Sequence, residues 1–488
     1  MADTLIPSNN NHTVDPAVAG LIEGDQTYET VSERLASIVL RQDRHGLPWW
    51  LLILIGFGGV NVLGMVVVKL LFTGVGIFGN NMPVSWGWPI INFVWWIGIG
   101  HAGTLISAFL LLMRQGWRAS INRLAEAMTI FAVSCAGIFP ALHTGRPWVD
   151  YWLFPYPNIL AMWPQWRSPL LWDVFAVTVY ALVSILFWFV GLIPDLATLR
   201  DRAENQYAKL VYGIACLGWR GSAEHWQRYE NASIMLAGLA TPLVVSVESI
   251  IALDFTIGIV PGWHATIFPP YFFAGALYAG FSMVIMLAIP LRKWYHLEDY
   301  ITPKHIDWCA KLMLVTGLVV LYGYIMECCY AYLSGDRYEI SMMHYRQFGP
   351  YWAAYWLLIL FSCVLPQMLW IPKIRHNNAA LYFLAIMVSI GMWLEKFIVV
   401  VVSLTHDYLP SSWGYFTNTF WDVAMYAGTI GQFILLFFLF VRFLPVINIS
   451  EVREIVLRTS RPFRRNHASS TNSDSVTEPA GITSEPVE

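Results

Sequence analysis

The sequence predicts an all-α integral membrane protein with ten transmembrane helices. Of its 488 residues, 57% are hydrophobic and only 12% are charged, and long apolar runs alternate with short polar loops. Soluble domains carry about 25% charged residues. Because a helix needs roughly 20 apolar residues to cross the core of a bilayer, apolar runs of this length indicate membrane-spanning helices.

Ten runs are long enough, and they form a membrane domain over residues 49–445. We place the helices at 49–72, 88–113, 124–141, 169–193, 232–257, 269–290, 308–333, 351–371, 379–404 and 420–444. The polar N-terminal segment 1–48 has no short apolar core with a cleavage site, which a signal peptide would need. Within it, residues 28–44 favour an amphipathic surface helix with Val31, Leu35, Ile38 and Val39 on one face. Residues 446–488 are polar and low in complexity, and we expect a disordered tail.

Positive charges predict the orientation of the helices. Of the 29 Lys and Arg residues, 21 lie in the N-terminal segment, the even-numbered loops and the C-terminal tail, whereas four lie in the odd-numbered loops. Loops rich in Lys and Arg stay in the cytoplasm. We therefore expect both termini to be cytoplasmic, in a bacterial cytoplasmic membrane. The net charge of -3 gives no reason to expect nucleic-acid binding.

Weak internal similarity indicates a duplication. The motif GHAG at 100–103 is followed by Arg114, as LYAG at 277–280 is followed by Arg292, and SPLLW at 168–172 parallels GPYWA at 349–353. We expect two tandem four-helix bundles, formed by helices 2–5 (88–257) and helices 6–9 (269–404), flanked by helices 1 and 10. Matching 231–238 to 378–385 also places Glu248 on Glu395.

The cysteines and histidines argue against a metal centre in this chain. None of the six cysteines forms a CxxC pair or a CxxCH haem-attachment motif. A b-type haem would need two facing histidines near mid-membrane, and only His101 lies there. We expect neither a metal ion nor a haem bound by this chain.

Ionisable residues inside a membrane are costly, so they mark candidate functional positions. With the predicted orientation, a cluster from helices 3–5 and their loops lies at the outer face: His143, Arg146, Asp173, Asp254 and His264. Glu248 is about two turns deeper than Asp254. The second copy lacks the cluster, because Asp173 falls on Ala354 and Asp254 on Val401.

A His–carboxylate pair can bind a quinol hydroxyl, accept its proton and release it outward. We expect His143 and Asp173 to be catalytic, with Trp148 and Tyr151 among the aromatic residues that would wall the quinol ring. Structural alternatives stay open. Arg146 can pair with Asp173, and the aromatic residues can form an interfacial belt.

A second set of ionisable residues can line a path for protons through the membrane: His101, Glu126, Glu248, Glu327, Glu395, Lys396 and Asp422. The alternative is that Glu395 and Lys396 bind partners on neighbouring helices and fix the packing. Adjacent helical positions point about 100° apart, so we expect these two side chains not to pair with each other.

The stretch FPALHTGRPW at 139–148, the following Asp173, the basic loop GWRGSAEHWQRYENAS at 218–233 and the duplication resemble the NrfD/polysulfide reductase membrane-subunit family over roughly residues 45–445. Within that family the chain is most similar to the quinol-oxidising membrane subunit of bacterial alternative complex III. The resemblance implies oxidation of a quinol, menaquinol in the first instance, at the periplasmic face. His143, Asp173 and Asp254 match the family's proposed quinol-binding positions.

The resemblance also implies a multisubunit respiratory or photosynthetic complex in the lipid membrane. Its expected partners are a periplasmic iron–sulfur subunit that takes the electrons, haem c subunits beyond it, and a sister membrane subunit of the same family. Protons from the quinol are released or translocated. Two other functions stay open, a secondary transporter and a passive anchor for peripheral redox subunits. The polar cluster at one face of continuous helices favours the quinol site over both.

Overall fold

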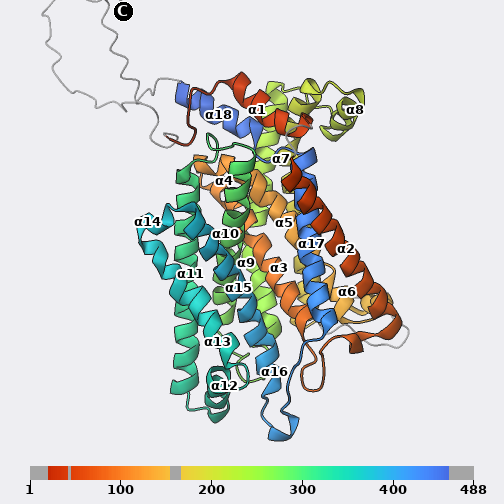
Figure 1. The fold of residues 1–488 in the computed structure, drawn as a ribbon, viewed down its shortest axis with the longest axis vertical. Helices are drawn as coiled ribbons and strands as arrows, with labels where there is room; N and C mark the ends of the chain where they lie inside the picture. The colour runs from red at the N-terminus through yellow and green to blue at the C-terminus, as the bar shows by residue number, and fades with distance from the viewer. Residues whose placement is uncertain (1–19, 42–45, 154–165, 461–488) are drawn as a thin grey trace, which may run out of the picture.

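The computed structural model describes residues 20–41, 46–153 and 166–460, and it contains no strand within them. Ten helical spans in these residues are long and apolar enough to cross a membrane, which confirms the predicted fold class. They are Leu47–Thr73, Trp88–Leu112, Asn122–His143, Pro169–Arg202, Ala223–Thr256, Phe268–Trp294, Pro303–Leu333, Trp352–Trp370, Asn378–Thr405 and Phe420–Phe443. Each overlaps one of the ten predicted runs, and together they stand side by side (Figure 1).

Six spans are single helices: α2 (Leu47–Thr73), α7 (Pro169–Arg202), α9 (Ala223–Thr256), α10 (Phe268–Trp294), α11 (Pro303–Leu333) and α17 (Phe420–Phe443). The other four are interrupted by a turn or change helix type on the way. They are α3 (Trp88–Thr104) with the π-helix η3 (Leu105–Phe109) and α4 (Leu110–Leu112); α5 (Asn122–Ala136) with α6 (Phe139–His143); α13 (Trp352–Ile359) with the π-helix η6 (Leu360–Val364) and the 3₁₀ helix η7 (Leu365–Trp370); and α15 (Asn378–Phe397) with the π-helix η8 (Ile398–Val402) and α16 (Ser403–Thr405).

Short helices cover the two ends of the bundle. One end carries α1 (Tyr28–Leu40), α8 (Gln206–Ala215) and α18 (Ile449–Ser460), drawn at the top of Figure 1, and we call it the basic end because the Arg-rich loops lie there. The opposite end carries α12 (Arg337–Phe348) and α16. The remaining short helices are η2 (Val75–Ile77), η4 (Gly116–Ser120), η5 (Pro147–Leu153), α14 (Pro372–Arg375) and η9 (Pro410–Ser412).

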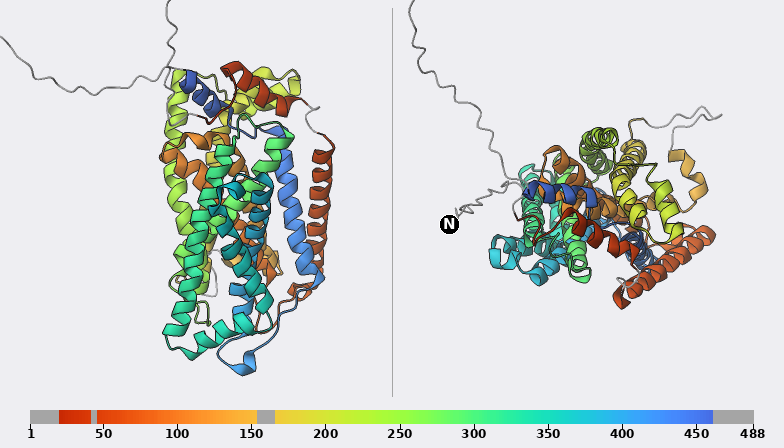
Figure 2. Two further views of the ribbon diagram at one scale, coloured as in Figure 1. Left: turned by 60° about the vertical axis from the view of Figure 1, so that its left-hand side comes forward. Right: turned by 90° about the horizontal axis from the view of Figure 1, so that it is seen from above.

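The first and last described helices, α1 and α18, lie together on the basic end (Figure 2). The face predicted for the N-terminal helix is buried, with Val31, Leu35, Ile38 and Val39 each at most 3% exposed. We expected a disordered tail from residue 446, but α18 is an ordered amphipathic helix whose Val452 is fully buried. Residues 461–488 lie outside the described part of the chain.

The two predicted bundles meet along α3 and α10, through residues almost without side chains. A Cβ atom on Gly280 would lie 2.3 Å from the Cβ of Ala102, and one on Gly98 would lie 3.4 Å from the Cβ of Ala276. The same residue spacing separates both pairs, so the two helices run parallel. Small residues let helix backbones approach closely in a membrane, where packing rather than hydrophobicity drives association.

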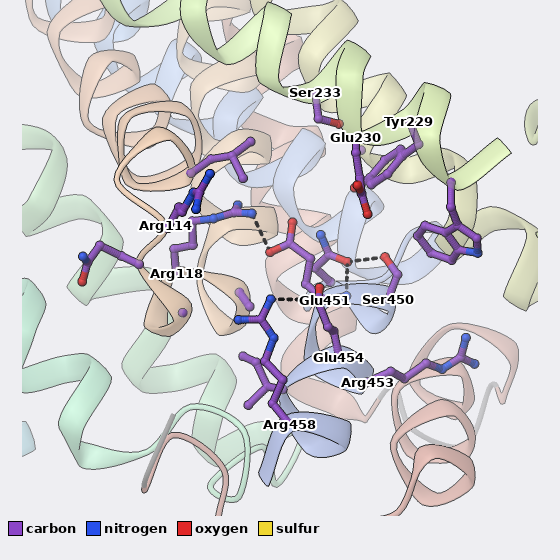
Figure 3. Close-up of a pocket in the computed structure, with 18 of the residues that line it drawn as sticks. Arg114, Arg118, Tyr229, Glu230, Ser233, Ser450, Glu451, Arg453, Glu454 and Arg458 are labelled. Carbon is purple, nitrogen blue, oxygen red and sulfur yellow. Dashed lines mark hydrogen bonds and ion pairs between the residues drawn. The ribbon is translucent and has the colours of Figure 1, made fainter. Parts of the chain in front are cut away.

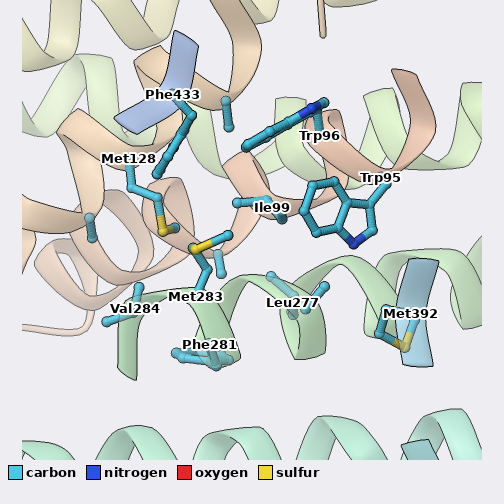
Figure 4. Packing of buried hydrophobic residues seen from close by; sticks show 14 of the residues in the cluster. Trp95, Trp96, Ile99, Met128, Leu277, Phe281, Met283, Val284, Met392 and Phe433 are labelled. Atoms are coloured by element: carbon cyan, nitrogen blue, oxygen red, sulfur yellow. The ribbon is translucent and has the colours of Figure 1, made fainter. Parts of the chain in front are cut away.

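Larger apolar side chains fill the space around this contact. Trp96 stacks on Phe433 with 5.1 Å between ring centroids, and its indole nitrogen donates to Thr429 Oγ1 at 3.1 Å. Figure 4 shows these rings beside Met128 and Met283. Because α3 contacts helices of both bundles and α17 as well, it is the central helix of the fold.

Each bundle carries a cluster of ion pairs at its basic end. In the first, buried Arg123 contacts Glu126 at 2.9 Å and Asp195 at 3.1 Å. In the second, Asp307 contacts Lys311 at 2.6 Å and Arg375 at 2.5 Å. At the offset that places Ser168 on Gly349, Glu126 falls on Asp307. At this offset an acid of one cluster falls on an acid of the other, but the first cluster is centred on a cation and the second on an anion.

Candidate functional site

A buried His–carboxylate pair lies inside the first bundle. His101 on α3 and Glu248 on α9 have no exposed surface, and His101 Nδ1 lies 2.8 Å from Glu248 Oε2. The two atoms are not aligned as in a hydrogen bond. Tyr180 packs edge-on against the imidazole, with 4.9 Å between ring centroids, and its hydroxyl lies 2.8 Å from Thr104 Oγ1.

Two further carboxyl groups lie between this pair and the end of the bundle opposite the basic end. Asp173, near the start of α7, lies close enough to Glu248 for their charges to interact, and Asp254, near the end of α9, interacts in the same way with Asp173. The structure therefore brings Asp173, Asp254 and Glu248 together.

One oxygen of each aspartate has no partner in the described part of the chain. Asp173 Oδ1 and Asp254 Oδ1 are both buried there without a hydrogen bond. Buried polar atoms are nearly always satisfied in folded proteins, so each exception asks for a ligand or another explanation. Here two acceptors from two helices, α7 and α9, share one region.

His143 and Arg146 lie at the same end of the first bundle. His143 ends α6 and is half-buried, and its Nδ1 lies 3.3 Å from the carbonyl oxygen of Phe139. Arg146 is exposed, and among the described residues no ion pair joins it to Asp173. The structure therefore leaves the carboxylate of Asp173 available to other groups.

Trp148 and Tyr151 lie on η5, after α6. Trp148 is 60% exposed and Tyr151 is 53% exposed, so both present aromatic surface at this end of the bundle. The rest of the aromatic loop, residues 154–165, lies outside the described part of the chain.

His264 does not join the aspartates. Its Nδ1 lies 3.4 Å from Glu339 Oε1 on α12, and the same carboxylate accepts a hydrogen bond from the backbone nitrogen of Gly262 at 3.0 Å. The loop after α9 is thus fastened to a helix of the second bundle. Sequence position alone indicated only the membrane side, not the partner.

The other residues predicted for a proton path fall into separate clusters. Glu126 belongs to the Arg123 cluster at the basic end. Glu327 on α11 pairs with Arg346 of α12 at 2.5 Å, and Arg346 also donates to Gly262 O and Ser403 Oγ. Asp422 accepts hydrogen bonds from the backbone nitrogens of Thr419 and Gly79, and so caps the start of α17.

Glu395 and Lys396 form an ion pair of 2.5 Å, so the expectation that they would not pair was wrong. The ammonium of Lys396 also lies 3.8 Å from the centroid of the Phe272 ring on α10. Tyr324 donates to the other oxygen of Glu395 at 2.8 Å. The Lys396 side chain is long and flexible enough to reach Glu395 although adjacent helical positions point about 100° apart.

Sequence reasoning missed Tyr180 and Arg346. Tyr180 lies two helical turns after Asp173 on α7, so a search at that spacing from each buried acid would have found it. Arg346 lies in a segment that we interpreted as a loop, and its partners come from three distant parts of the chain. No local pattern could have predicted that arrangement. In the described residues, no group of three His, Cys, Asp or Glu side chains is placed to hold a metal ion.

Comparison with known proteins decides the family. Residues 76–406 match the model of the polysulphide reductase NrfD family, which is most of the chain. The chain belongs to this family. Membership supports a redox role, as a multi-pass membrane subunit of a quinone-linked oxidoreductase complex.

Individual relatives of the chain are distant. A putative dimethyl sulfoxide reductase membrane subunit of Halobacterium salinarum is 23% identical over 331 residues, which is 65% of this chain and 68% of that protein. A selenate reductase subunit of Mesobacillus selenatarsenatis is 21% identical over 388 residues, which is 75% of this chain and 86% of that protein. At such distances the substrates of the relatives do not transfer, because one fold supports many chemistries.

Proposed function

We propose that this chain oxidises a quinol at the end of the first bundle that lies opposite the basic end. It would act as the quinol-binding membrane subunit of a bacterial electron-transfer complex. The observation that carries the proposal is the pair of buried oxygens, Asp173 Oδ1 and Asp254 Oδ1, that have no partner in the described chain. A quinol carries two hydroxyl donors on a flat ring, and buried carboxylates are strong acceptors for them. His143 lies at the same end and can accept a proton.

Oxidation of one quinol to quinone releases two protons and two electrons. In this proposal the pair formed by His143 and Asp173 accepts the first proton. Asp254 or Glu248 accepts the second. The electrons pass to an iron–sulfur subunit on the same side of the membrane, which acts as oxidant, and then to haem c subunits. The family resemblance supports menaquinol as the quinol and the quinol-oxidising subunit of alternative complex III as the nearest functional parallel.

The buried pair of His101 and Glu248 extends the carboxyl cluster deeper into the bundle. We include it as the first part of a proton path, because an ionisable pair in contact inside a membrane-spanning bundle is costly and marks a functional position. Glu126, Glu327, Glu395 and Asp422 each have partners within their own clusters. Any path through them would have to break those contacts.

The proposal is tested by His143→Ala and Asp173→Asn in the assembled complex. Loss of a general acid or base slows a reaction by about 10²–10⁴-fold, so each variant should lose most quinol oxidation while keeping its subunits. His344→Ala is the matched control, since His344 is an exposed histidine of α12 in the second bundle. If both site variants assemble and turn over within a factor of a few of the parent, the quinol is oxidised elsewhere.

A further inference from the structure

A cavity of about 750 Å³ opens at the basic end, far from the proposed quinol site. It lies between the end of α4 with the following η4, the helices α7 and α9, and the C-terminal helix α18 (Figure 3). Volumes of this size are typical of sites for small molecules. The residues that line it form two groups, one apolar and one charged.

One part of the lining is apolar and lies within membrane-spanning helices. Leu111, Phe187 and Ile234 belong to three different spans, and Ile234 is 55% exposed on the outer surface. The other part is charged and lies at or beyond the ends of the spans, most of it on η4 and α18. A cavity that is apolar toward the membrane and charged toward the basic end fits an amphiphile whose headgroup lies at that membrane surface.

Most charges of the lining are already paired. Arg118 contacts Glu451 at 2.9 Å, and Arg458 contacts Glu454 at 2.5 Å. Figure 3 shows both pairs. Glu126, which also lines the cavity, is paired with Arg123. These contacts leave little net charge for a simple anion.

Three charges of the lining have no ion pair among the described residues. The guanidinium of Arg453 is hydrogen-bonded to Ser32, Tyr28 and Thr198, which leaves Arg114 and Glu230, of opposite charge, on different walls. Arg114 follows α4, Glu230 lies on α9, and both side chains are exposed to the cavity. Within the described residues neither side chain has a hydrogen bond or an ion pair. Arg114 also has a φ of 53°, a conformation that non-glycine residues adopt at a cost and that concentrates at functional sites.

We propose that this cavity binds a phospholipid with an ethanolamine headgroup. The phosphate would lie against the guanidinium of Arg114, which is suited to bidentate bonding of phosphate oxygens. The primary ammonium would donate hydrogen bonds to the carboxylate of Glu230. The acyl chains would leave past Leu111 and Ile234 into the membrane. A choline headgroup has no N–H to donate, and a glycerol headgroup has no positive charge for Glu230.

The test uses the full chain in detergent, stripped of lipid and reloaded with ethanolamine, choline or glycerol phospholipids of identical acyl chains. Bound lipid is counted by native mass spectrometry. We expect the ethanolamine lipid to be retained in preference to the other two. Arg114→Gln should weaken retention of all three by about tenfold, the value of one charge-assisted hydrogen bond, whereas Glu230→Gln should weaken only the ethanolamine lipid and so remove the preference.

Arg220→Gln and Glu204→Gln are matched controls, because both residues are exposed at the same end and neither lines the cavity. Thermal unfolding without lipid verifies that each variant is folded. Equal retention of the three lipids by the parent chain, or unchanged retention by Arg114→Gln, would overturn the proposal. Displacement of the lipid by millimolar inorganic phosphate would also overturn it, because the site would then recognise a free anion and not a lipid.

Discussion

His101 on α3 and Glu248 on α9 meet inside the first bundle with 2.8 Å between Nδ1 and Oε2, and neither side chain has exposed surface. The contact joins the helix that packs against the second bundle to the helix that carries Asp254. The carboxyl cluster of the proposed quinol site is therefore connected to the centre of the fold.

Replacing Glu248 by Gln keeps the shape of the side chain but removes its ability to take a proton. If the pair begins a proton path, quinol oxidation by the assembled complex should fall by at least about tenfold, since proton transfer to a positioned group contributes 10²–10⁴-fold. Glu224→Gln, an exposed position on the same helix, should have no effect. Normal turnover in Glu248→Gln would show that protons leave by another route.

Arg123 should be essential for stability. It is the shared cation of Glu126 and Asp195, so Arg123→Ala leaves two buried carboxylates without a counter-charge. Removal of one partner of a buried pair costs about 3–5 kcal/mol. The unfolding temperature in detergent should fall clearly, and adding Glu126→Gln and Asp195→Asn should recover part of the loss. No recovery in the triple variant would mean that packing, and not charge, explains the effect.

The contacts of His406, at the end of the protein opposite the basic end, should weaken as the pH falls. His406 is stacked between Tyr345 and Trp413, with 4.3 and 3.9 Å between ring centroids, and bonds to Ser341 Oγ at 2.9 Å. Burial lowers the pKa of His406 because it disfavours the charged imidazolium. When the pH drops through about 6.5, the unfolded histidine takes up a proton but the folded one does not, so stability is lost down to the lowered pKa.

Hydrogen exchange of α12 and residues 405–419 measures this loss. Protection factors, which correct for the slower intrinsic exchange at lower pH, should fall between neutral and mildly acidic pH in the parent chain. His406→Phe, which keeps the stacking but cannot titrate, should remove this fall. A pH dependence that survives in His406→Phe belongs to another group.

The orientation can be tested directly. A reporter at the C-terminus should be cytoplasmic, and one inserted in residues 405–419 should be external, since 21 of the 29 Lys and Arg residues favour the side that carries the termini. In the structure α18 and the 405–419 loop lie at opposite ends, as this orientation requires (Figure 1). An external C-terminal reporter would reverse the assignment of the quinol site to the periplasmic face.

The sequence predicted the spans well because ten apolar runs and the charges between them are local signals. It also placed Asp173, Asp254 and Glu248 near one another, since the chain alternates direction at each helix. It could not predict that His264 would bind Glu339, or that Arg346 would join Glu327, Gly262 and Ser403. Those contacts depend on the conformation of the segment around α12, where polar composition concealed a helix.

The contact of Ala102 with Gly280 limits how the protein can work. At that point the two bundles touch almost backbone to backbone, so any sliding or rocking of one against the other would open a void or a clash. A transporter that alternates its access between two sides needs a mobile interface at such a place. In this chain the interface between α3 and α10 is closely packed instead. Changes at the proposed quinol site would therefore have to reach the second bundle as moving charge rather than as moving helices.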